Sequence, residues 1–299
     1  MKLVIICGPT ASGKSELAVA LAEKIGGEVI NADSMQLYRG MDIGTAKITE
    51  EDRHGIPHHL LDILDVNEDA SVASYQALAR KSIAEISARG KYPILVGGTG
   101  LYIKSTVDEM NFPETDQSVR GSLEAEAETY GTAALYQRLS ELDPLAAEKI
   151  EPANTRRIIR ALEVIAITGE AYSAQLPKDE SSLYPDALHI GLQIDRSELA
   201  PRIEARTEKM FTRGLVGEVE SLIPKGLLQG TTAQRAIGYS QTLRHLAGEI
   251  TFDAAVEETK TATRQYVRRQ ETWFKRDNRI QWIPTDANPL DKVIAKIES

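Results

Sequence analysis

Short apolar runs alternate with amphipathic segments over the first hundred residues of the chain. The runs at 3–7, 28–32 and 92–96 are typical of buried strands, because each is short, mostly apolar and bounded by polar residues or glycine. Between them, residues 74–88 place apolar side chains at helical spacing, and Gly90 ends that pattern. This alternation predicts an α/β fold with a parallel sheet and helices on both faces.

The stretch from 113 to 195 has a different pattern. Alanine and glutamate are abundant, helical spacing recurs, and prolines punctuate it. We interpret 113–195 as a helical insertion domain that divides the core domain into 1–112 and 196–299. Residues 189–194 nevertheless have the pattern of a strand that returns to the sheet. Beyond them, the pattern predicts helices at 199–213, 216–223, 234–246 and 252–276 and a last strand at 281–283.

A glycine-rich string separates the first predicted strand from the helical pattern after it. It is Gly8-Pro9-Thr10-Ala11-Ser12-Gly13-Lys14-Ser15, which matches GxxxxGK[ST]. In this context backbone N–H groups at the helix start bind phosphate oxygens, Lys14 adds positive charge, and Ser15 is suited to hold Mg²⁺. The string predicts a P-loop NTPase-like fold with a phosphate site at 8–15, which by itself indicates a nucleotide triphosphate, and Mg²⁺ as its cofactor.

Polar residues follow two further strands. Asp33 comes directly after the second strand, where a carboxylate suits a general base or a water-mediated Mg²⁺ ligand, and equally a helix N-cap. Thr99 is the hydrogen-bonding side chain of the glycine turn 97–100. The loop after Asp33 carries groups that suit RNA bases and phosphates, or an ordinary polar turn: Ser34, Gln36, Tyr38 and Arg39.

Two sets of basic side chains have helical spacing. In the insertion, spacings of three and four place Arg157 and Arg160, or Arg156 and Arg160, on one helix face. These arginines suit phosphate contacts, while salt bridges with Glu163 are the alternative. The second set is Arg202, Arg206, Lys209 and Arg213, a stripe able to reach a phosphate cleft.

The overall charge and its distribution point in different directions. The 299 residues carry a net charge of −9, which by itself disfavours a nucleic-acid partner. Between Lys260 and Arg279, however, seven basic residues face two acidic ones, a local charge of +5. This segment is either a basic face or an ordinary solvated helix surface.

The remaining composition narrows the class of protein. Cys7 is the single cysteine, so disulfides within the chain and cysteine metal clusters are excluded, in agreement with a cytoplasmic location. No apolar stretch approaches the roughly 20 residues of a membrane span. His54, His58 and His59 have neither the spacing nor the neighbouring cysteines of a zinc site, so we interpret them as hydrogen-bonding loop residues.

Taken together, these strings resemble the bacterial tRNA dimethylallyltransferases. Besides the string at 8–15, the matching segments are INADSMQLY at 30–38, DIGTAK at 42–47, GIPHHL at 55–60, VGGTGLY at 96–102, RALE at 160–163, AIGY at 236–239 and RRQETWF at 268–274. They occur in the family's order over nearly the whole chain. Several such motifs are far more specific than the glycine-rich string alone.

The resemblance implies transfer of a dimethylallyl group from dimethylallyl diphosphate to the exocyclic amine of the adenosine 3′ of the tRNA anticodon. Residues 8–15, with Arg206, would hold the diphosphate. Asp33 would be the general base, and Thr99 would orient the amine or the donor. The insertion would grip the anticodon stem-loop of tRNA, and the enzyme would be a monomer. The implied tRNA contacts are Asp33, Ser34, Met35, Gln36, Arg39, Arg156, Arg157, Ile158, Ile159 and Arg160.

Three other functions fit parts of the sequence. A nucleotide-kinase-type enzyme would bind ATP at 8–15 and use the helical insertion as a lid. An isopentenyltransferase acting on free adenine nucleotides would share Asp33 but lack a large RNA-gripping insertion. A non-catalytic RNA-binding module would have no need for a phosphate loop suited to Mg²⁺.

Overall fold

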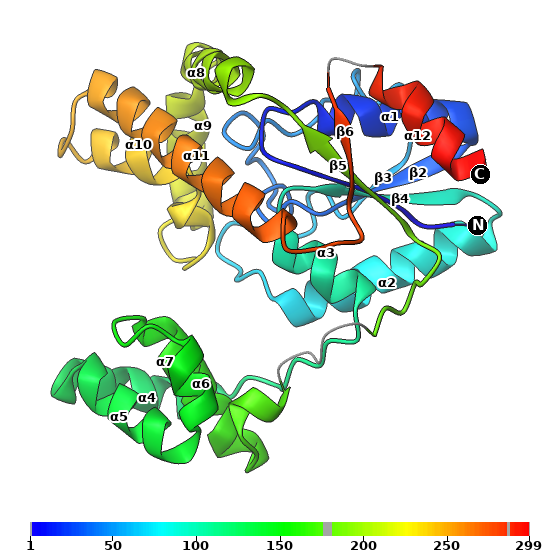
Figure 1. Cartoon of the computed structure of the whole chain (residues 1–299). Helices are drawn as coiled ribbons and strands as arrows, with labels where there is room; N and C mark the ends of the chain where they lie inside the picture. Colours follow the sequence, from blue (N-terminus) through cyan, green and yellow to red (C-terminus); the bar gives the residue numbers. More distant parts are fainter. Residues whose placement is uncertain (1, 176–180, 286–287, 299) are drawn as a thin grey trace. The chain divides into compact units, whose positions relative to one another are not determined.

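The computed structural model describes residues 2–175, 181–285 and 288–298. These residues form two compact units, the first comprising 1–107 and 184–299 and the second comprising 108–183. Figure 1 shows the sheet of the first unit and the helices of the second. Within the described ranges, no helix is both long and apolar enough to cross a bilayer.

The first unit is built on a parallel sheet of six strands, as the alternating pattern predicts. The strands are β1 (Val4–Cys7), β2 (Gly27–Asn31), β3 (His58–His59), β4 (Tyr92–Gly97), β5 (Leu188–Gln193) and β6 (Gln281–Pro284). Their order is β3-β2-β4-β1-β5-β6, so β1 is central. Only β3 has no counterpart in the sequence pattern, since two histidines pairing with β2 are too short to leave a periodic signal.

Helices cover both faces of this sheet (Figure 1). Alternate residues of β1 point to opposite faces. Val4 and Ile6 pack with α1 (Lys14–Ile25) and α12 (Pro289–Glu298), whereas Ile5 and Cys7 pack with α2 (Val72–Ala88) and α3 (Gly100–Val107). The near-continuous apolar runs therefore reflect strands that are buried on both sides.

A second helical layer belongs to the same unit and carries its own core. It consists of α8 (Arg196–Thr212), α9 (Leu215–Leu222), α10 (Tyr239–Leu246), α11 (Phe252–Phe274) and the short 3₁₀ helices η2 (Ile223–Lys225) and η3 (Ala233–Arg235). The helix predicted from 234 begins only at Tyr239, because Gly238 has a positive φ of 91° that interrupts the helical pattern.

The second unit is helical, as predicted. It contains α4 (Gln117–Tyr130), α5 (Thr132–Leu142), α6 (Pro144–Lys149), α7 (Thr155–Thr168) and the 3₁₀ helix η1 (Tyr172–Gln175). Its limits are 108–183 and not the expected 113–195. The end was placed too late because β5 pairs with β1 in the core sheet, so the strand predicted at 189–194 belongs to the first unit.

Candidate active site

A cavity of about 700 Å³ opens at the carboxyl ends of the central strands, in the first unit. Parallel sheets bind ligands at this edge, where the loops after neighbouring strands converge. The phosphate loop after β1, the loop after β2 and the glycine turn after β4 all contribute to its wall. The remaining cationic part of the wall comes from one face of α8, through Arg202, Arg206 and Lys209, and from Arg213 directly after this helix. All four residues of the predicted stripe therefore reach the cavity.

The phosphate loop is preformed. Its Lys14 ammonium and Ser12 hydroxyl both donate to the Pro9 carbonyl, at 2.6 and 2.8 Å. Gly13 has a φ of 85°, which lets the chain turn into α1. Among the described residues, no acceptor pairs with the backbone N–H groups of residues 11–15. These donors, at the start of a helix that bears the predicted lysine, are suited to bind an anion.

Two cations stand close together beside this loop. Burial, and then the nearby Arg206 guanidinium, lower the pKa of the Lys14 ammonium to about 8. Burial also lowers the pKa of Arg206, while Asp33 and Glu16 act in the opposite direction. In the described part of the chain no carboxylate forms an ion pair with Arg206, whose guanidinium donates to the Thr45 carbonyl at 3.3 Å. The site thus concentrates positive charge that a polyanion would neutralise.

Asp33 is held by the residues around it. The Asn31 side chain accepts from the Asp33 N–H and donates to the Asp33 carbonyl, both at 3.0 Å, and it also donates to the Leu60 carbonyl. One carboxylate oxygen, Oδ1, accepts from the Met35 N–H at 2.9 Å. A turn and not a helix follows, so Asp33 is no helix N-cap. Asp33 lines the same cavity as the phosphate loop, and its charge acts to raise the pKa of both Lys14 and Arg206.

The glycine turn is joined to the Asp33 loop through Thr99. The Thr99 hydroxyl accepts from the Ser34 N–H at 3.1 Å, and the Thr99 N–H donates to the Ala32 carbonyl at 3.1 Å. A Cβ on Gly97 would lie 2.2 Å from that same carbonyl, so glycine is required for this approach. The two residues predicted to be catalytic therefore lie on loops that are hydrogen-bonded to each other.

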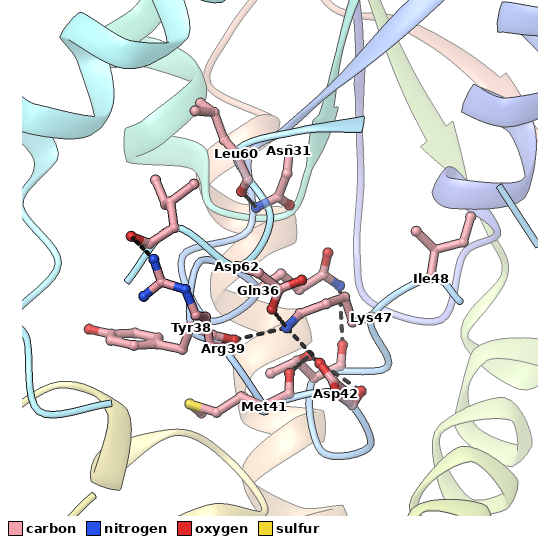
Figure 2. A network of polar contacts seen from close by, with 12 residues as sticks. Asn31, Gln36, Tyr38, Arg39, Met41, Asp42, Lys47, Ile48, Leu60 and Asp62 are labelled. Carbon is pink, nitrogen blue, oxygen red and sulfur yellow. Dashed lines mark hydrogen bonds and ion pairs between the residues drawn. The ribbon is translucent and has the colours of Figure 1, made fainter. Parts of the chain in front are cut away.

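A buried lysine that the sequence did not single out holds the next loops in place (Figure 2). The Lys47 ammonium donates to the Tyr38 carbonyl at 2.8 Å, to Asp42 at 2.7 Å and to Asp62 at 2.5 Å. Its side chain is only 3% exposed. Lys47 thereby fixes the DIGTAK segment at 42–47 against the loop that follows Asp33.

This segment orients two predicted contacts at once. The Thr45 carbonyl accepts from Arg206 at 3.3 Å and from the Gln36 amide at 3.2 Å. From α9, the Glu218 carboxylate accepts the N–H groups of residues 42–44 at distances between 2.7 and 3.1 Å. The signal that pointed to 42–47 was the family motif. Glu218 had no such signal, because its partners lie far away in the sequence.

The other residues predicted to contact tRNA differ in their exposure to solvent. Arg39 lies on the surface and pairs with Asp65 at 2.6 Å. Arg156 and Arg157 are exposed on α7. Ile158 and Ile159, in contrast, are buried in the core of the second unit, so their side chains present no surface to RNA. Their inclusion came from reading 156–160 as a continuous contact, whereas a helix alternates its faces.

Arg160 is engaged inside the second unit. It donates to Glu163 at 2.8 Å and to the Pro113 carbonyl at 2.7 Å. Glu163 is fully buried and also receives Arg120 at 2.7 Å. Burial raises the pKa of Glu163, but the Arg160 and Arg120 guanidinium groups outweigh it and hold that pKa below its usual range. For Arg160, salt bridging is therefore the arrangement seen.

The basic segment 260–279 is committed to ion pairs at its start, by Lys260 and Arg264, whereas Arg268, Arg269, Lys275 and Arg276 are exposed. Lys260 pairs with Glu208 and Glu257 at 2.9 and 2.8 Å, and Arg264 lies 3.6 Å from Glu204. The three histidines each have a separate partner: His54 contacts Glu23, His58 the Ile56 carbonyl, and His59 Glu28. Within the described ranges, no cluster of histidine, cysteine and acidic side chains suited to a metal was found.

Comparison with known proteins identifies the family. A family model described as IPP transferase matches residues 36–277. A tRNA dimethylallyltransferase of Streptomyces coelicolor is 54% identical over 282 residues, which cover 94% of this chain and 90% of the relative. The crystal structure of a tRNA isopentenylpyrophosphate transferase from Bacillus halodurans aligns with a TM-score of 0.73 and 43% identity, over 99% of this chain and 94% of that one.

A eukaryotic dimethylallyltransferase acting on tRNA gives a TM-score of 0.85 at 29% identity, over 99% of this chain and 78% of the other. These similarities extend across both the α/β core and the helical unit. They confirm the predicted α/β fold of the P-loop type and the assignment as a transferase. The chain belongs to the IPP transferase family, the family of the tRNA dimethylallyltransferases.

Proposed function

We propose that this protein transfers a dimethylallyl group from dimethylallyl diphosphate to the exocyclic amine of the adenosine 3′ of the anticodon in tRNA. The observation that carries this proposal is the single cavity wall shared by the phosphate loop, Asp33, the glycine turn and Arg206. An anion site and a carboxylate facing one another are what transfer from a diphosphate to a weakly nucleophilic amine requires.

The donor end of the cavity would stabilise the leaving group. As the allylic C–O bond breaks, negative charge builds on the diphosphate. The N–H groups of residues 11–15, which have no acceptor among the described residues, together with Lys14 and Arg206, would stabilise that charge. Preorganised donors of this kind lower the barrier because they need no rearrangement during the reaction.

The acceptor end would bind the adenosine amine. Its lone pair is delocalised into the ring, so removal of a proton as the new C–N bond forms makes the attack easier. Asp33 Oδ1 already accepts from the Met35 N–H, so we assign proton removal to Oδ2. Thr99, whose hydroxyl contacts Ser34, would orient the amine or the bridging oxygen of the donor.

The residues beside the loop fit a magnesium ion. The Ser15 hydroxyl lines the cavity at the first turn of α1, with no hydrogen-bond partner among the described residues. Oxygen donors are what Mg²⁺ prefers, and the ion usually completes its shell with phosphate oxygens and water. When bound, Mg²⁺ would neutralise part of the diphosphate charge.

We assign the grip on the tRNA anticodon stem-loop to the helical unit and to the loop after Asp33. Arg156 and Arg157 remain the exposed cations of the predicted contact on α7. The target base must leave its stack to reach the cavity, which costs a few kcal/mol that RNA contacts offset. The same proposal places the enzyme, as a monomer, in the cytoplasm with its tRNA substrate.

The direct test is incubation with radiolabelled dimethylallyl diphosphate, Mg²⁺ and unmodified tRNA. We expect the label in the RNA, at one adenosine next to the anticodon. Label on free adenine nucleotides but not on tRNA would assign the protein to the nucleotide-modifying class. ATP turnover without any labelled RNA would indicate a kinase-type enzyme.

The general-base role has its own test in Asp33→Asn. The amide keeps an oxygen for the Met35 N–H but cannot take a proton at neutral pH. We expect the single-turnover rate of transfer to fall by roughly 10² to 10⁴-fold, with tRNA affinity nearly unchanged. A variant that keeps most of its turnover would refute the role of Asp33 as base.

A further inference from the structure

One glutamine of α11 connects the two ends of the cavity. Gln270 is 5% exposed and makes two hydrogen bonds across a large sequence separation. Its Oε1 accepts from the N–H of Thr10 in the phosphate loop at 2.9 Å. Its Nε2 donates to the carbonyl of Gly98, next to Thr99, also at 2.9 Å. A single side chain thus bridges the loop assigned to the donor and the glycine turn, which Thr99 joins to the Asp33 loop on the acceptor side.

The geometry leaves this amide one orientation. The Thr10 N–H can only donate and the Gly98 carbonyl can only accept, so both partners fix which end of the amide is oxygen. Space is equally restricted, because a Cβ on Gly98 would lie 2.2 Å from Gln270 Nε2. The Tyr266 hydroxyl, one turn earlier on α11, lies 3.5 Å from the same carbonyl.

We propose that Gln270 is a positioning residue that sets the separation between the phosphate loop and the turn bearing Thr99. The inference rests on the proposed function, since it assigns the donor to one loop and the acceptor to the other. Gln270 does not need to touch either substrate. Without it, each substrate still binds its own loop, but the allylic carbon and the amine no longer meet at the reactive distance.

This division predicts a loss in rate and not in binding. For Gln270→Ala we expect kcat to fall by about 10²-fold, the effect of an error of about 1 Å in placing the reactants. The Kd values for dimethylallyl diphosphate and for tRNA should change by less than about threefold. A fall in either affinity that matches the fall in kcat would overturn the positioning role.

Gly98→Ala supplies an independent variant through the same contact. Its methyl group would displace the Gln270 amide, so its loss in kcat should equal that of Gln270→Ala. The double variant should be no worse than either single one, because the methyl group fills space that Gln270 vacates. As a control, Gly100→Ala meets Trp273 of the same helix instead, and its loss should multiply with that of Gln270→Ala. If the losses in kcat of Gly98→Ala and Gln270→Ala multiplied in the double variant, the proposal would be contradicted.

Hydrogen exchange tests the bridge without any substrate. In Gln270→Ala the Thr10 N–H loses its acceptor, and we expect its exchange to accelerate by at least about tenfold. Unchanged exchange of this amide would overturn the bridge whatever the kinetics show. A wild-type protein that transfers no label to RNA would contradict the proposed function alone, and the exchange result would still decide whether Gln270 couples the two loops.

Discussion

Arg206 in the α/β unit and Arg160 in the helical unit are both arginines that the sequence assigns to phosphate contacts. Arg206 faces the cavity, and its hydrogen-bond partner is the Thr45 carbonyl. Arg160 forms an ion pair with the fully buried Glu163 and donates to the Pro113 carbonyl. The arginine of the α/β unit thus remains available for a ligand, whereas the arginine of the helical unit stabilises the fold through an internal ion pair.

The difference lies in what each region does with its charge. In the cavity, burial lowers the pKa of Lys14 and Arg206, which means that their charged forms carry a desolvation cost that a bound anion would offset. In the helical unit, Glu163 already supplies that anion to Arg160 and Arg120. An arginine is therefore a better binding candidate when the structure leaves it without a carboxylate.

The largest effect on stability is expected from removing Glu163, the internal anion of the helical unit. Glu163→Ala should lower the free energy of unfolding by about 3 kcal/mol, the low end for a broken buried pair, because Arg120 and Arg160 are partly exposed. Urea denaturation, with hydrogen exchange to locate the change in 108–183, measures it. Asp65→Asn, which breaks the exposed pair with Arg39, is the control and should cost less than about 1 kcal/mol. Equal losses in the free energy of unfolding would contradict the expected difference between the buried and the exposed ion pair.

Removing Arg206 from the cavity should lower the activity and leave the stability intact. For Arg206→Ala we expect kcat/KM for transfer to fall by roughly 10² to 10³-fold, as for loss of one preorganised donor to a developing anion. Its stability should be unchanged or higher, because a half-buried cation without a carboxylate ion pair is gone. Arg202→Ala, on the same helix and cavity wall but paired with Glu198, should lose much less activity. If Arg206→Ala lowered the free energy of unfolding, Arg206 would have a structural role like that of Arg160.

The pH dependence of the cavity follows from Lys14. Its pKa of about 8 keeps the ammonium mostly charged at pH 7, so the affinity for inorganic diphosphate should fall as pH rises above 8. Stability should change in the other direction: between pH 8 and 10.5 the unfolded chain holds the proton and the folded one does not, so this group raises the free energy of unfolding with pH. Titration calorimetry measures the affinity.

Lys14→Arg is the control for that titration, because arginine stays charged throughout the range. The ratio of the two affinities removes the titration of diphosphate itself. A ratio that does not change across pH 8 would show that Lys14 does not titrate there.

The smallest effect is expected on the surface of α7. Arg156→Ala combined with Arg157→Ala should weaken tRNA binding and reduce the slope of log K against log salt by roughly 1.4, for two contacts at about 0.7 each. Arg160→Ala should leave that slope unchanged, since its guanidinium is engaged with Glu163. Salt titrations of tRNA affinity for both variants measure the contrast. An unchanged slope for the Arg156 and Arg157 double variant would show that these arginines of α7 do not contact RNA phosphates.

Short sequence patterns predicted much of the fold and of the candidate site. The alternation of strand and helix patterns predicted the parallel sheet, and the string at 8–15 predicted the loop that the structure places at the end of β1. Asp33 and Thr99 were recognised because each directly follows a strand. In all these cases the signal lies in a short stretch of sequence, because burial period and backbone freedom are readable over a few residues even where the partners are distant.

The tertiary structure decided which charged and polar groups meet. Gln270 contacts Thr10 and Gly98 across 260 and 172 positions, and Glu218 contacts the segment at 42–44 across more than 170. Nothing in the local pattern shows what Gln270 and Glu218 contact, and for Arg160 it leaves open both a phosphate contact and the ion pair with Glu163 that the structure has. Whether an arginine stays available for a ligand depends on where the nearest carboxylate lies after folding. Arg160 has Glu163 three residues away on its own helix, whereas the surroundings of Arg206 are set by packing between distant segments.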